Sequence, residues 1–97
     1  MGTMKTWNIN YKGHAIRVQN GWFSGEQLSV DGETQDARRG FAFRSQLSGR
    51  IRSGEGAGER IRVALGGWFI IGCDLFIDDR PIPTGRATYG ITNDHAA

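Results

Sequence analysis

Short runs of alternating hydrophobic and polar residues, separated by glycine-containing turns, constrain this chain more than any other feature. A period of two residues sends successive side chains to opposite faces, as in a half-buried β-strand. The alternating runs are Trp7, Ile9 and Tyr11; His14, Ile16 and Val18; Leu28 and Val30; Ile61, Val63 and Leu65; and Phe69, Ile71, Cys73, Leu75 and Ile77. The last of these runs is apolar enough to predict a central strand.

The turns between these runs favour antiparallel hairpins. They are Lys12-Gly13, Asn20-Gly21, Asp31-Gly32 and Ser53-Gly54, and Asn-Gly or Asp-Gly supplies the positive φ that tight hairpins need. No stretch at helical spacing is long enough to connect parallel strands. We therefore predict an all-β fold, an antiparallel β-sandwich of about seven to eight strands. Its single domain spans 5–83, followed over 84–97 by a short edge strand and a frayed polar tail.

One segment in the middle of the chain divides its side chains sharply between two faces. Its hydrophobic face comprises Phe41, Phe43, Leu47 and Ile51, and its polar face comprises Arg44, Gln46, Ser48, Arg50 and Arg52. Gly49 interrupts the pattern, and we predict that it marks a bulge or a turn between two strands.

Residues 16–32 resemble residues 61–79, which predicts an internal pseudo-repeat. The matched triplets and longer segments are Ile16-Arg17-Val18 with Ile61-Arg62-Val63, Gly21-Trp22-Phe23 with Gly67-Trp68-Phe69, and Leu28-Ser29-Val30-Asp31-Gly32 with Leu75-Phe76-Ile77-Asp78-Asp79. Repetition of strand order and turn type is the interpretation we prefer. Chance similarity between short strands is the alternative, because few residue types suit strands.

Composition limits the function classes. A single cysteine, Cys73, excludes an internal disulfide, and the absence of a signal-peptide pattern favours a cytoplasmic protein. The longest apolar stretch, 68–73, is too short to cross a membrane. With only His14, His95 and Cys73 beside the carboxylates, no metal-ligand cluster forms, and we expect neither metal nor cofactor. A net charge of +2 means that any nucleic-acid role needs a local basic patch.

Two sets of residues are candidate binding surfaces. Arg44, Arg50 and Arg52 share one outward parity and Arg60 and Arg62 share another, so the two sets merge into a basic stripe if their strands pair. The alternative is a solvated face with interspersed carboxylates. The other candidates are Trp22 and Trp68, each in a Gly-Trp-Phe turn, which either stack on sugars or bases or plug the core.

The remaining polar residues favour structural interpretations. His14 is expected at the rim of the core, and Cys73 as a buried, inert thiol. Asp74, within an apolar strand, must face water or an arginine. The segment Gly54–Gly58 is similar to a phosphate-binding loop, but it leads into a predicted strand rather than a helix, so we interpret it as a mobile hairpin tip.

Several strand and turn motifs together carry a family resemblance. They are Trp7-x-Ile9, His14-x-Ile16, Ser24-Gly25, Leu28-x-Val30-Asp31-Gly32, Ile61-x-Val63 and Leu75-x-Ile77-Asp78. Over about residues 7–80 this order resembles the β-sandwich domain of the Fas apoptotic inhibitory molecule, and small uncharacterised bacterial proteins. The resemblance implies an antiparallel sandwich, no known catalytic residues and interaction with other proteins. The chain differs from that family in its single domain, its arginine-rich second half and its Gly54–Gly58 loop, so an apoptotic role is not carried over.

Three functions follow as hypotheses, in order of preference. The first is a non-enzymatic interaction or structural module that binds a protein partner, or itself, through a sheet face or an edge strand. The second is weak, salt-sensitive nucleic-acid binding through the arginine stripe. The third is an enzyme with an unrecognised site, placed last because no titratable pair has an evident reason to converge.

Overall fold

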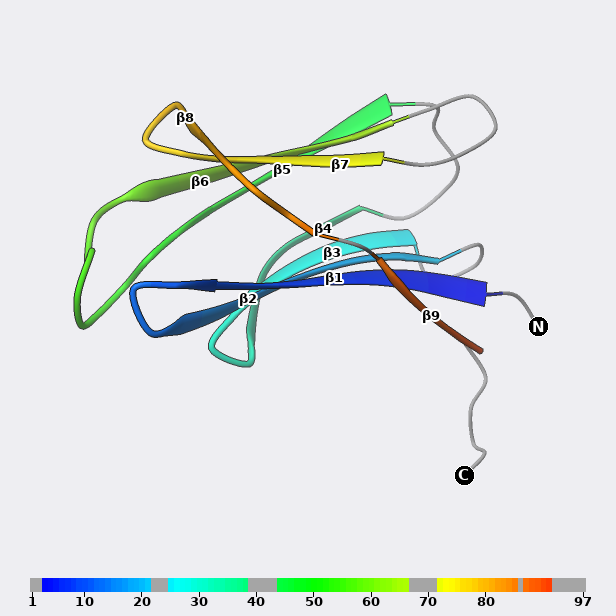
Figure 1. Cartoon of the computed structure of the whole chain (residues 1–97), viewed down its shortest axis with the longest axis horizontal. Coiled ribbons are helices and arrows are strands. Elements are labelled where there is room, and N and C mark those ends of the chain that lie inside the picture. Colours follow the sequence, from blue (N-terminus) through cyan, green and yellow to red (C-terminus); the bar gives the residue numbers. More distant parts are fainter. Residues whose placement is uncertain (1–2, 22–24, 39–43, 67–71, 86, 92–97) are drawn as a thin grey trace.

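The computed structural model describes residues 3–21, 25–38, 44–66, 72–85 and 87–91. These residues form nine strands, shown in Figure 1: β1 (Thr3–Tyr11), β2 (His14–Gly21), β3 (Gly25–Val30), β4 (Glu33–Arg38), β5 (Arg44–Arg50), β6 (Arg60–Gly66), β7 (Gly72–Ile77), β8 (Arg80–Ile82) and β9 (Thr88–Ile91). No helix occurs in this part of the chain, and none is therefore long and apolar enough to cross a membrane.

The strands form two antiparallel sheets that lie face to face (Figure 1). One sheet has five strands in the order β4-β3-β2-β1-β9, and the other has four in the order β5-β6-β7-β8. The predicted antiparallel β-sandwich is confirmed, with nine strands where about seven to eight were expected. β7 lies inside its sheet, as predicted. β1 begins at Thr3 and pairs with β9, so paired strands extend beyond 5–83 at both ends.

The core lies between the sheets and is built from the residues that the alternation assigned to it. Its buried members are Trp7, Ile9, Ile16, Val18, Leu28 and Val30 from the larger sheet, and Leu47, Ile51, Ile61, Val63, Leu65, Leu75 and Ile77 from the smaller sheet and its flank. Burying a side chain of this size stabilises the fold by about 1.5–3 kcal/mol. Because strand side chains alternate, this burial fixes which residues face outward, including Arg50 and Arg60.

The second strands of the hairpins β2–β3 and β6–β7 lead into β4 and β8, respectively, through equivalent turns. Asp31 and Gly32 have φ angles of 51° and 84°, and Asp78 and Asp79 have 49° and 64°. Each first aspartate donates its backbone N–H across the hairpin, at 2.8 Å and 2.9 Å, and accepts a backbone N–H on its Oδ1 at 2.9 Å. The two turns are therefore alike, and the pseudo-repeat of 16–32 in 61–79 stays a prediction.

The outer edge of β5 is covered by side chains from β4. The Gln35 amide accepts the backbone N–H of Arg50 at 2.6 Å and donates to its carbonyl oxygen at 2.9 Å. Asp36 Oδ2 accepts the backbone N–H of Ser48 at 2.8 Å. On the other side, the chain passes from β8 in one sheet to β9 in the other (Figure 1). The N–H and carbonyl of Arg50 and the N–H of Ser48 are therefore bound at this edge without a partner strand.

The prediction for Gly49 is wrong. Pairing of β5 with β6 continues through Gly49, opposite Ile61, with neither a bulge nor a turn. The glycine is needed because Gln35 approaches so closely: a Cβ at position 49 would lie 2.5 Å from Gln35 Oε1 and 2.9 Å from Leu28 Cδ2. The register shift lies elsewhere, between β3 and β4, at Leu28 and Ser29.

Candidate functional site

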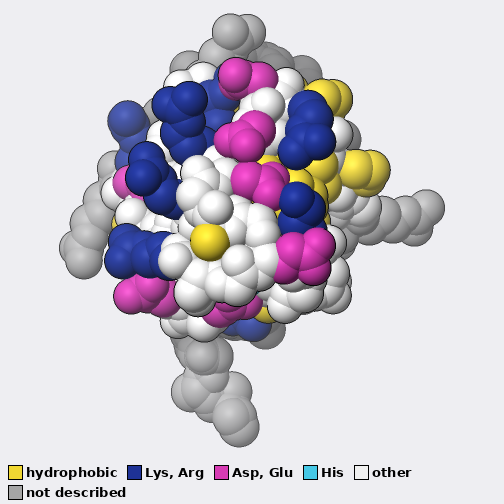
Figure 2. All heavy atoms as spheres, turned by 90° about the vertical axis from the view of Figure 1, so that its left-hand side faces the viewer, with side chains coloured by type: hydrophobic (Ala, Val, Ile, Leu, Met, Phe, Trp, Pro, Cys, Tyr) yellow, Lys and Arg dark blue, Asp and Glu magenta, His cyan; other side chains and the backbone are white. Residues whose placement is uncertain are grey.

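One end of the sandwich carries the turns between β1 and β2, β3 and β4, and β7 and β8, together with residues 51–59. Figure 2 shows this end: Lys and Arg side chains lie on both sides of it, more of them on the left, with acidic side chains between them. Here an open groove of about 980 Å³ lies along the outer face of β5 and β6. Four arginine residues and two aspartates line it: Arg50, Arg52, Arg60, Arg62, Asp78 and Asp79. We call this feature the arginine groove.

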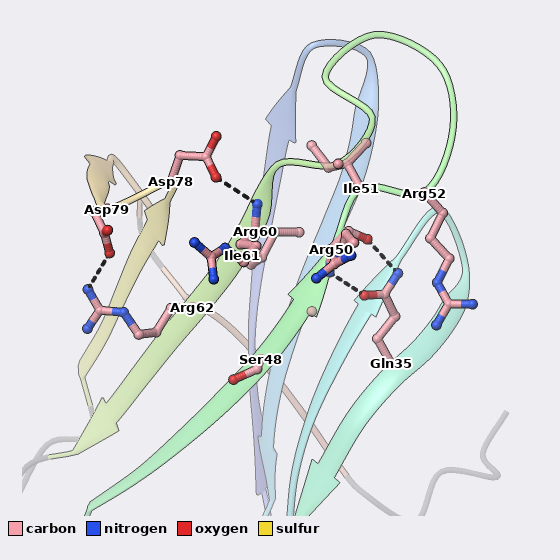
Figure 3. A pocket seen from close by; sticks show the side chains of 12 residues that line it. Gln35, Ser48, Arg50, Ile51, Arg52, Arg60, Ile61, Arg62, Asp78 and Asp79 are labelled. Carbon is pink, nitrogen blue, oxygen red and sulfur yellow. Dashed lines mark hydrogen bonds and ion pairs between the residues drawn. The ribbon is translucent and has the colours of Figure 1, made fainter.

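The arginine groove exists because β5 and β6 pair in one register. Arg50 lies opposite Arg60, and Ser48 lies opposite Arg62 (Figure 3). The backbone N–H and carbonyl of Arg50 point to Gln35 rather than to β6. Arg50 and Arg60 therefore form a non-hydrogen-bonded pair, in which Cα atoms are only about 4.5 Å apart and side chains are closest. Two positively charged side chains therefore leave the sheet from neighbouring positions on the same face.

Carboxylates accompany two of these arginines and not the other two. Arg62 Nη2 lies 3.5 Å from Asp79 Oδ1, and Arg52 Nε lies 3.9 Å from Glu33 Oε1. These pairs are long and exposed, so they contribute little stability. Among the residues that the structure describes, no ion pair involves the guanidinium of Arg50 or Arg60. The expected interspersed carboxylates are present at the rim of the groove, whereas the charges of Arg50 and Arg60 are not balanced by an ion pair with a described carboxylate.

The backbone positions of both central arginines are fixed by neighbouring side chains (Figure 3). Gln35 binds the N–H and the carbonyl of Arg50. Asp78 Oδ1 accepts the N–H of Arg60 at 2.9 Å, and the N–H of Asp78 donates to the carbonyl of Arg60 at 2.9 Å. Hydrogen bonds therefore fix the backbone from which each of the two arginine side chains projects.

The other predicted site residues lie apart from the arginine groove or outside the described residues. Arg44 begins β5 opposite Gly66, at the other end of the strand from Arg50. Trp22 and Trp68 lie outside the described residues. Their two interpretations, stacking platform or core plug, stay predictions.

A carboxylate that the sequence did not single out ties the two sheets together beside this end. Glu59 accepts Tyr11 Oη–H at 2.5 Å and Lys12 Nζ at 2.7 Å, and Arg80 Nη2 lies 3.5 Å away. Hydrogen bonds from Lys12 and then Tyr11 hold the pKa of Glu59 below its usual value. No periodicity marks this cluster, because its members come from β1, its turn, the segment before β6 and β8.

His14 links β2 to two other segments. Its Nδ1 lies 2.6 Å from Asp31 Oδ2 and its Nε2 lies 2.7 Å from the carbonyl oxygen of Glu55. Both neighbours are acceptors, so both ring nitrogens must carry protons to satisfy them. The hydrogen bond to Asp31, followed by that to Glu55, raises the pKa of His14. The side chain is buried at the edge of the core, as predicted.

The segment 51–59 is held more firmly than the mobile hairpin tip that we expected. Gly58 N–H donates to the carbonyl of Ile51 at 2.8 Å, and Ile51 N–H donates to that of Glu59 at 3.0 Å. His14 binds Glu55 from outside. The segment leads into β6, a strand, so it lacks the helix N-terminus of a phosphate-binding loop.

The His14 contacts are expected to make stability fall as pH rises above neutrality. A histidine with a raised folded-state pKa contributes stability that is complete below the unfolded value of 6.5 and is lost as pH rises through the folded value. Urea unfolding of the wild type and of His14→Gln from mildly acidic to mildly alkaline pH tests this. The stability gap between them should narrow with rising pH, and a gap independent of pH would contradict it.

Cys73 and Asp74 do not contribute to the arginine groove. Burial, and secondarily the charge of Asp74, raises the pKa of the half-buried Cys73 thiol to about 12, which makes it a poor nucleophile near neutral pH. Asp74 is exposed on the outer face of β7, so it faces water. Among the described residues, no group of three or more His, Cys, Asp or Glu side chains is placed to hold a metal ion.

The fold and the groove together define a small antiparallel β-sandwich with a basic groove on the outer face of its four-stranded sheet. Neither a family model, nor a curated protein, nor a solved structure matches this chain. The resemblance to the Fas apoptotic inhibitory molecule gains no support from these comparisons and stays a prediction.

Proposed function

We propose that this chain is a non-enzymatic, cytoplasmic binding module that holds an acidic segment of a protein partner in the arginine groove. The observation that carries the proposal is the pair Arg50 and Arg60, opposed across β5 and β6 with no carboxylate partner among the described residues. Like charges directly opposite each other destabilise a sheet. An anion bound between them removes that repulsion, which favours a ligand of negative charge.

The rim of the arginine groove favours a short acidic segment over a nucleic-acid strand. Asp78 and Asp79 line one side, and Glu33 lies beside Arg52. A nucleic-acid backbone needs a continuous basic track, which these carboxylates interrupt. Single strands also use exposed aromatic rings. Phe76, the aromatic residue opposite Arg62 on this face, is covered by the Arg62 guanidinium at 4.5 Å from its ring centroid.

The proposal uses the sheet face rather than a strand edge. Gln35 and Asp36 already bind the outer edge of β5, so a partner strand must displace both side chains before it can pair there. Catalysis is not part of the proposal, because both nitrogens of His14 are engaged and the Cys73 thiol has a pKa of about 12.

Fluorescence anisotropy with two labelled probes tests the proposal. The probes are a glutamate-rich peptide and a single-stranded oligonucleotide of equal net charge, each titrated at low and at physiological salt. We expect the peptide to bind more tightly than the oligonucleotide. Replacing both Arg50 and Arg60 with glutamine should weaken peptide binding roughly tenfold or more, because charge-assisted hydrogen bonds are lost.

Arg17→Gln is the matched control. Arg17 is exposed on the outer face of the five-stranded sheet, away from the groove, so its replacement should leave the peptide affinity unchanged. Tighter, steeply salt-dependent binding of the oligonucleotide would instead favour the nucleic-acid hypothesis. Equal losses in the Arg17 and the Arg50/Arg60 variants would mean that the arginine groove is not the site.

A further inference from the structure

The pair Arg50 and Arg60 is suited to one doubly charged group rather than to two separate carboxylates. We infer that the acidic segment carries a phosphorylated side chain, and that its phosphoryl group sits between the guanidinium groups of Arg50 and Arg60. This inference rests on the proposed function of the arginine groove and names the group that anchors its ligand.

Charge is the first argument. Arg50 and Arg60 lie opposite each other on one face of the sheet, and neither forms an ion pair with a carboxylate among the described residues. A phosphorylated side chain carries about −1.5 to −2 at neutral pH, whereas a glutamate or aspartate carries one negative charge. A single phosphoryl group therefore neutralises the two arginines, whereas a single carboxylate leaves one of the two positive charges without a negative counterpart.

Geometry is the second argument. In a non-hydrogen-bonded antiparallel pair the Cα atoms are about 4.5 Å apart, and both side chains leave the sheet on the same face. Each arginine presents a planar fork of donors that matches a phosphate bidentately, and the phosphate has three acceptor oxygens to share between two forks. Gln35 and Asp78 fix the strand backbones from which Arg50 and Arg60 project, so the site is partly organised before a ligand arrives.

The surrounding residues favour a phosphorylated peptide over other phosphates. Arg52 and Arg62 flank the pair. Their carboxylate contacts are long and exposed, and Arg62 also stacks on Phe76, so both guanidinium groups keep donors for acidic residues on either side of a phosphorylated one. Each phosphodiester of a nucleic acid carries a single negative charge, and its next phosphates would have to pass the carboxylates of Asp78 and Asp79.

Three peptides that differ at one position test the inference. The central residue is phosphoserine, glutamate or serine, with the same acidic flanks, and affinities are measured by anisotropy. We expect the affinity of the phosphoserine peptide to exceed that of the glutamate peptide by about tenfold or more. Arg50→Lys and Arg60→Lys keep the positive charge but lose the planar guanidinium donors. Each should lower the affinity for the phosphoserine peptide toward that for the glutamate peptide, whereas Arg17→Lys should not.

A second measurement does not depend on the peptide sequence. Inorganic phosphate titrated into ¹⁵N-labelled protein should shift the side-chain Nε–H signals of Arg50 and Arg60 saturably, and acetate at the same concentration should not. Equal affinity for the glutamate and phosphoserine peptides, both lost in Arg50→Gln, would overturn the phosphoryl inference and leave the proposed function standing. Peptide binding that is unchanged in Arg50→Gln, or the absence of binding to all three peptides, would overturn both the phosphoryl inference and the proposed function.

Discussion

The Gly49→Ala variant is expected to lose about 1–3 kcal/mol of its free energy of unfolding, the cost typical of an overpacked core. The added Cβ would lie 2.5 Å from Gln35 Oε1 and 2.9 Å from Leu28 Cδ2. Leu28 is fully buried, and Gln35 is held by two hydrogen bonds to the backbone of Arg50. To relieve the contact, either Leu28 must move within the core or Gln35 must give up its hydrogen bonds to the edge of β5. Urea unfolding measures the loss.

Gly72→Ala is the matched control, because Gly72 also lies in a strand but a Cβ there would make no close contact. The nearest atom to an added Cβ would be the carbonyl oxygen of Gly66, at an ordinary 3.7 Å. Alanine also has less conformational entropy than glycine in the unfolded chain, so stability should be unchanged or slightly higher. A Gly49→Ala variant as stable as Gly72→Ala would mean that Gln35 does not cover β5 closely.

The core and the outward arginines were predictable because both follow from a single periodicity. Burial of Leu47, Ile61 and Val63 sets the faces of β5 and β6, and the pleat then places Arg50 and Arg60 outside. The turn predicted at Asn20-Gly21 is wrong, because both residues lie within β2 and pair with β1 and β3. The antiparallel arrangement followed from the other three predicted turns, which do lie between strands. These predictions succeeded because each depends on residues close together in the chain.

The register between strands was not predictable from the same information. Arg50 faces Arg60 because residues 51–59 fold back with a particular geometry, and a shift of one residue would have separated the two charges. The close approach of Gln35, which explains Gly49, comes from β4 in the other sheet. Glu59 and Tyr11 are 48 positions apart, and nothing local to either residue indicates their contact.

In the proposed function, Arg50 and Arg60 bind the ligand at a cost to the stability of the fold. Arg50→Glu should therefore change affinity and stability in opposite directions. A glutamate at position 50 would face Arg60 and lie diagonal to Arg62, which converts repulsion into attraction and raises the free energy of unfolding by about 0.2–1 kcal/mol. The same change should weaken binding of the acidic peptide about tenfold or more, because it reverses one of the two central charges.

The most direct test measures both quantities on one preparation of Arg50→Glu, by urea unfolding and by peptide anisotropy, with Arg17→Glu treated identically as the control. We predict that Arg50→Glu is more stable than the wild type and binds the acidic peptide more weakly, while Arg17→Glu keeps the wild-type affinity. An unchanged affinity in Arg50→Glu, or an affinity that falls only because stability falls with it, would contradict the assignment of the arginine groove as the binding site.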